Sequence, residues 1–128
     1  MRVGVCLSFA VALALGAAPV AASAQSVQEQ YRALADQAQG ELEAGQAELK
    51  ILFDGDPADA VVCPHMAAAM KHFASARGTY SLLQQLATRG GYGDVAKSAG
   101  EMRDGAGDYI VKFTPYYDEH CAALTGAL

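Results

Sequence analysis

Apolar residues recur at steps of three and four residues along three long segments of this 128-residue chain. That spacing keeps one face of an α-helix apolar, because the helix completes a turn every 3.6 residues. Gln, Glu, Asp, Lys and Ser fill most of the opposite positions. The pattern therefore predicts amphipathic helices that fold by burying their apolar faces against one another.

Turn-forming residues separate the predicted helices. The first helix covers residues 26–52 and ends at the run Asp54, Gly55, Asp56 and Pro57, which favours a turn. Its apolar face consists of Val27, Tyr31, Leu34, Ala38, Leu42, Leu49 and Leu52. The second helix has Pro64 in its first turn and ends at residues 90–91, a pair of glycines. Its apolar face consists of Met66, Met70, Phe73, Ala76, Tyr80, Leu83 and Ala87.

The third segment follows Asp94, which can cap a helix. Its apolar face runs through Val95, Ala99, Met102, Ala106, Tyr109, Ile110, Phe113, Tyr117, Cys121 and Leu124. Gly105, Gly107 and Pro115 could break this segment, and a reversal at Gly105 would give a four-helix bundle. One kinked helix is favoured, because the apolar spacing continues across these positions.

The first 24 residues read as a secretory signal peptide. Arg2 precedes an apolar run from Val3 to Ala18, and small residues at 22–24 suit a signal peptidase that cleaves before Gln25. The run is shorter than the ~20 apolar residues that span a bilayer. We therefore expect a single helical domain over residues 25–128, exported to the periplasm or secreted, with no stable membrane span after cleavage.

The expected mature domain is acidic. Arg2 is the only charged residue before Glu29, so residues 25–128 hold all 14 acidic residues and eight of the nine basic ones, a net charge of −6. Binding to nucleic acid or to anionic lipid needs the opposite balance. We therefore expect neither as a partner.

Two cysteines remain once the signal peptide is removed. Cys63 and Cys121 would enter an oxidising compartment, where an even pair usually forms a disulfide. In an up-down-up bundle of three helices, the start of the second helix and the end of the third lie at the same end, and the two cysteines occupy those positions. The prediction is thus an all-α, up-down-up three-helix bundle closed by one disulfide.

The disulfide would bring two histidines together. His65 follows Cys63 by two residues, and His120 directly precedes Cys121 with Glu119 beside it. Two imidazoles and a carboxylate suit zinc or copper(II), so His65, His120 and Glu119 are candidate metal ligands. The alternative is that these are solvated polar residues at a helix end.

No catalytic motif stands out: the sequence contains neither G-x-S-x-G nor H-E-x-x-H. The favoured interpretation is a non-enzymatic binding or interaction module with a protein or cell-envelope partner, and the alternative is a small metal-binding protein. Tyr116 lies off the apolar face of the third segment. It is therefore a candidate exposed anchor for a partner.

Overall fold

A computed structural model of the chain describes residues 20–53 and 58–122. These residues form three helices and no strand: α2 (Val20–Phe53), α3 (Asp59–Arg89) and α4 (Gly93–His120). The prediction of an all-helical bundle is confirmed for this part of the chain. Residues 1–19 of the predicted signal peptide lie outside the described residues. The predicted turn at residues 54–57 also lies outside them. α2 begins at Val20, earlier than the predicted residue 26, because the Val-Ala-Ala-Ser-Ala sequence holds no helix breaker.

The described residues fall into two compact units, with the boundary between Arg32 and Ala33 inside α2. The first unit holds the beginning of α2. The second holds the rest of α2 together with α3 and α4. No helix in the described ranges is long and apolar enough to cross a membrane.

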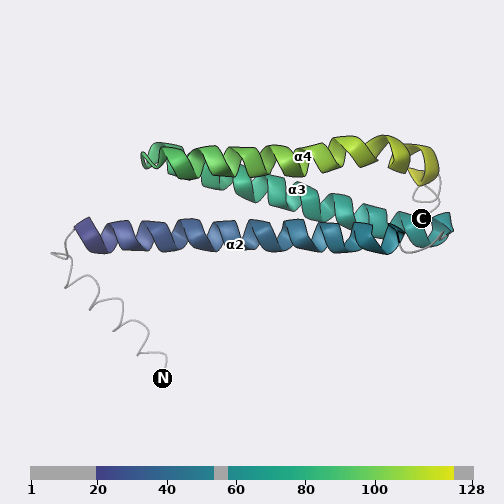
Figure 1. The fold of residues 1–128 in the computed structure, drawn as a ribbon, viewed down its shortest axis with the longest axis horizontal. Coiled ribbons are helices and arrows are strands. Elements are labelled where there is room, and N and C mark those ends of the chain that lie inside the picture. The colour runs from purple at the N-terminus through teal and green to yellow at the C-terminus, as the bar shows by residue number, and fades with distance from the viewer. Residues whose placement is uncertain (1–19, 54–57, 123–128) are drawn as a thin grey trace, which may run out of the picture. The chain divides into compact units, whose positions relative to one another are not determined.

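Neighbouring helices of the second unit run antiparallel (Figure 1). Later residues of α2 contact earlier residues of α3, because Glu41 bonds to His72 whereas Glu48 bonds to His65. α3 and α4 are related in the same way, since Phe73 stacks on Tyr109 near the middle of the helices and Cys63 meets Cys121 at one end.

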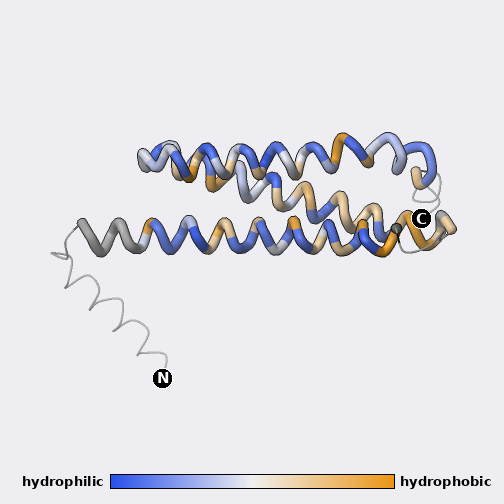
Figure 2. Tube along the Cα trace, in the orientation of Figure 1, coloured by the Kyte–Doolittle hydropathy of each residue, from blue (hydrophilic) through white to orange (hydrophobic). Residues whose placement is uncertain are grey.

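Buried positions alternate at steps of four and three, the spacing of a coiled coil. On α3 the buried residues with this spacing are Val62, Met66, Ala69, Phe73, Ala76, Tyr80, Leu83 and Ala87, and Cys63 is buried next to Val62. On α2 the same spacing links Ala38, Leu42, Gly45 and Leu49, all of them buried. Hydrophobic and hydrophilic residues accordingly alternate along α2 and α4 (Figure 2). Each helix thus presents one apolar seam to the others.

Two predictions about prolines and glycines differ in outcome. Pro64 lies inside α3 rather than in its first turn, so that prediction is wrong. The helix tolerates it because Pro64 and Ala60, whose carbonyl loses its usual partner, are both exposed to solvent. The preference for one third helix is confirmed: α4 continues through Gly105, Gly107 and Pro115. The four-helix alternative therefore does not hold for the described residues.

Candidate functional site: a groove between α2, α3 and α4

A tight turn between α3 and α4 positions one end of the groove. The amides of Gly90 and Tyr92 bond to the carbonyls of Leu86 and Ala87 at 3.0 and 2.9 Å, which closes the last turn of α3. Gly91 has φ of 79°, a left-handed conformation that favours glycine. The reversal places the first turns of α4 beside the last turns of α3.

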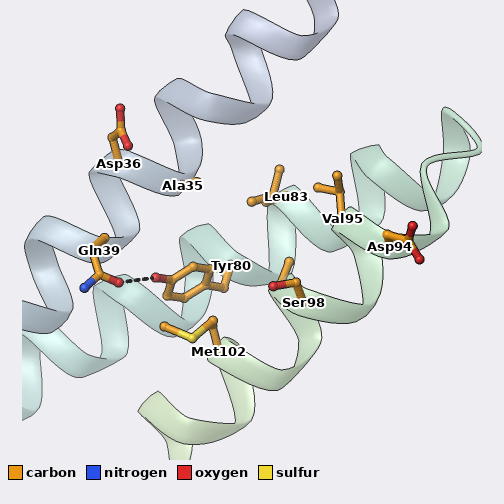
Figure 3. A pocket seen from close by; sticks show the side chains of 10 residues that line it. Ala35, Asp36, Gln39, Tyr80, Leu83, Asp94, Val95, Ser98 and Met102 are labelled. Atoms are coloured by element: carbon orange, nitrogen blue, oxygen red, sulfur yellow. Dashed lines mark hydrogen bonds between the residues drawn. The ribbon is translucent and has the colours of Figure 1, made fainter.

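Beside these turns, α2, α3 and α4 enclose a cavity of about 490 Å³ (Figure 3). Its apolar lining comes from Ala35 on α2, Leu83 on α3, and Val95, Ala99 and Met102 on α4. Its polar lining consists of Asp36, Gln39, Tyr80, Asp94 and Ser98. Four of the polar residues, all except Tyr80, are exposed, so the cavity is a groove that opens to solvent.

Tyr80 is the buried polar residue of the groove. Its hydroxyl donates a hydrogen bond to Oε1 of Gln39 at 3.2 Å, drawn as the dashed line in Figure 3. Burial, with a smaller contribution from the Glu43 carboxylate, raises the pKa of Tyr80 above its ordinary value of 10.0. The phenol therefore stays neutral and anchors α2 to α3 at the inner wall of the groove.

Two carboxylates lie on opposite sides of the groove in Figure 3, Asp36 on α2 and Asp94 at the start of α4. Both are exposed. Within the described part of the chain, neither carboxylate forms an ion pair or hydrogen bond with a side chain. The groove therefore combines apolar walls with a negatively charged rim.

A second cavity, of about 430 Å³, is lined by α3 and α4. Arg77, Arg103, Asp104, Gly107, Asp108 and Val111 line it. Arg103 bonds to Oδ1 of Asp104 at 2.9 and 3.0 Å and also to Gln84. The guanidinium charge of Arg103 is thus already matched by a carboxylate.

The predicted cysteine pair is brought together. The sulfur atoms of Cys63 and Cys121 lie at 2.04 Å, the distance of a disulfide bond, with their Cα atoms at 5.5 Å. Both residues are buried. The pair joins the start of α3 to the end of α4.

The predicted metal ligands are not gathered into one site. Nδ1 of His65 lies 2.6 Å from Oε2 of Glu48 on α2, whereas the ring of His120 packs on Tyr116, with ring centroids at 4.3 Å. Nε2 of His120 is 4.0 Å from Oε2 of its neighbour Glu119. Among the described residues, no group of three His, Cys, Asp or Glu side chains is arranged to hold a metal ion.

Tyr116, the predicted partner anchor, is 39% exposed. Its ring tilts against His120 at an interplanar angle of 33°. The residue is accessible, but one side of the ring is occupied by this contact. That it anchors a partner stays a prediction.

Two histidine–glutamate pairs connect α2 to α3 and were not predicted. His72 Nδ1 lies 2.6 Å from Glu41 Oε2, matching the His65–Glu48 pair two turns away. An ionised carboxylate only accepts hydrogen bonds, so Nδ1 donates in both pairs. The seven-residue spacing on both helices was the available signal: it places each pair beside the apolar seam, where interhelical polar contacts of coiled coils form.

The groove was also missed by sequence reasoning. Its signal is the small side chain of Ala35, which lies seven residues before the buried Leu42 in the same seam of α2. Where Leu42 fills the space between helices, Ala35 leaves it open. Comparisons with protein-family models, with curated proteins and with solved structures find no match to this chain.

Proposed function

We propose that this chain is a small exported binding protein that holds the apolar part of a small ligand in the groove between α2, α3 and α4. The observation that supports this proposal is the cavity of about 490 Å³ with apolar walls. Small-molecule sites are typically clefts of ~300–1,000 Å³ that combine an apolar lining with a few polar groups. The role is binding without a chemical step.

The contrast with the rest of the seam strengthens the proposal. Phe73, Ala76 and Ala106 have no exposed surface, so the middle of the bundle is closely packed. Beside Ala35 and Ala99 the side chains are too short to close the same gap. An apolar opening forfeits van der Waals contacts with neighbouring atoms, and a ligand that fills it restores them.

The groove also has fixed walls. Tyr80 and Leu83 are each 4% exposed, and the hydrogen bond from Tyr80 to Gln39 joins two of the helices that form the site. A wall that is already ordered loses little conformational entropy when a ligand binds. The fold therefore offers a preformed site rather than one that must be built by the ligand.

The binding test uses 4-phenylbutanol, a neutral probe with an apolar body, and calorimetry on the purified protein. Ala35→Phe places a ring in the groove and should abolish saturable binding. Ala47→Phe is the matched control, because Ala47 is an exposed residue of α2 that does not line the groove. Equal binding by the two variants, or no binding by the wild type, would overturn the proposal.

Export is the second part of the proposal, and the N-terminal sequence supports it. The test is the intact mass of the protein recovered from outside the cytoplasm of the producing cell. A chain that starts at Gln25 is expected. A recovered chain that retains residues 1–24, or protein that stays entirely in the cytoplasm, would contradict export while leaving the binding proposal open to its own test.

A further inference from the structure

We infer that the groove selects ligands that carry a positive charge, as an amine or quaternary ammonium attached to an apolar body. This inference rests on the proposed function and names the class of ligand that the same site takes. Asp36 and Asp94 carry it, together with the apolar residues between them. An apolar body would contact Leu83, Val95 and Met102, and the cationic group would lie at the rim near the carboxylates.

The charge of the groove is one-sided. Its lining holds two acidic side chains and, among the described residues, no lysine, arginine or histidine. The two residues come from different helices and lie at opposite ends of the groove lining, with Leu83 and Val95 between them (Figure 3). A cation that binds at either end is therefore attracted by the nearer carboxylate, whereas an anion is repelled.

Asp36 and Asp94 differ from three other carboxylates of the bundle. Glu41 and Glu48 pair with histidines, and Asp104 pairs with Arg103. Those carboxylates already have a partner within the protein. The two groove carboxylates keep their acceptor oxygens available to a ligand. Asp94 is also in the first turn of α4.

Two physical effects set the expected size of the preference. A solvent-exposed ion pair contributes modestly, because water weakens the Coulomb attraction. One such pair corresponds to a preference of about 2- to 5-fold for a cation over a matched neutral ligand at low salt. The net charge of −6 over residues 25–128 adds a longer-range attraction, and this part weakens as salt shortens the Debye length.

The test compares three probes with the same apolar body: 4-phenylbutylamine, 4-phenylbutanol and 4-phenylbutyrate, which are cationic, neutral and anionic at pH 7. Their dissociation constants are measured by calorimetry at low and at high salt. The wild type should bind the amine about 2- to 5-fold more tightly than the alcohol, and the butyrate most weakly. The preference for the amine should decrease at high salt.

Two variants of equal charge assign the preference to the groove. Asp36→Asn combined with Asp94→Asn should bring the amine-to-alcohol ratio close to one. Asp118→Asn combined with Glu119→Gln removes the same two charges near the other end of α4, outside the groove, and should keep most of the ratio. Circular dichroism confirms that both variants are folded.

The outcomes separate the two proposals. If none of the three probes binds, the proposed function is overturned and the charge preference falls with it. If the alcohol binds in the groove but the amine binds no more tightly, the preference alone is overturned. A ratio that responds equally to both double variants would assign the effect to net charge and would also overturn the inference.

Discussion

The ring of Phe73 on α3 lies directly against the backbone of Gly45 on α2. A Cβ atom at Gly45 would come within 2.6 Å of Cε1 of Phe73, a separation that no packed structure tolerates. Phe73 has no exposed surface, and its ring stacks on Tyr109 with ring centroids at 4.5 Å and an interplanar angle of 6°. Three helices therefore meet at one aromatic ring.

Substitution of Gly45 by alanine is expected to destabilise the protein by about 1–2 kcal/mol, because the trapped Phe73 ring has no free space to move into. Gly40→Ala, in the same helix, should instead stabilise by about 0.5–1 kcal/mol, since nothing lies within 4 Å of that position and alanine favours the helix. Urea unfolding of both variants measures the two effects. Changes of the same sign would contradict the close approach.

Loss of the Cys63–Cys121 link is expected to lower the free energy of unfolding by about 4 kcal/mol, since it closes a loop of 58 residues. Thermal unfolding of the wild type with and without a reductant measures the effect. A variant with both cysteines replaced by alanine is the control, and reductant should not change its melting temperature. A wild-type melting temperature that is the same in both conditions would show that the bond does not stabilise the fold.

The two histidine–glutamate pairs define the alignment of α2 against α3, and double-mutant cycles can test this alignment. The cycles Glu48→Gln with His65→Gln and Glu41→Gln with His72→Gln should each give a coupling of about 0.2–1 kcal/mol, because all four side chains are partly exposed. The crossed cycle, Glu48→Gln with His72→Gln, should give none. Coupling in the crossed cycle would indicate a different alignment.

The buried phenol of Tyr80 makes stability depend on pH in the alkaline range. Its folded-state pKa is raised above 10.0, so its contribution is fully present below pH 10 and is lost as pH rises further, when the unfolded chain ionises first. Tyr80→Phe should lower the free energy of unfolding by about 0.5–1.5 kcal/mol, because the hydrogen bond to Gln39 is lost. Above pH 10 the stability of the wild type should therefore decrease more steeply than that of Tyr80→Phe, as measured by urea unfolding. Parallel decreases would contradict the assignment.

The sequence predicted the helices and the cysteine pair because both depend on spacing. The apolar steps of three and four residues are visible in the printed chain, and they placed Leu42, Phe73 and Ala106 correctly in the core. The pairing of the two cysteines followed from the order of the helices. To predict these features it is enough to know which face of its helix a residue occupies, and the helical period determines that face.

The partners of polar side chains were not predicted, because they depend on how one helix is shifted along another. His65 was considered only together with His120 and Glu119, whereas the alignment of α2 places Glu48 beside it at 2.6 Å. The groove depends on the same alignment, since Ala35 and Ala99 leave a space only when they lie near Tyr80. A shift of one turn would change every such contact while leaving the apolar seams unchanged.

The most direct test of the groove is an NMR titration of the isotopically labelled protein with 4-phenylbutanol, following methyl resonances. We expect saturable shifts at Leu83, Val95 and Met102, which line the groove, and little change at Val111, which lines the second cavity. Shifts centred on Val111, or no saturable shift at any methyl group, would contradict the account of this protein as a binding module that acts through the groove.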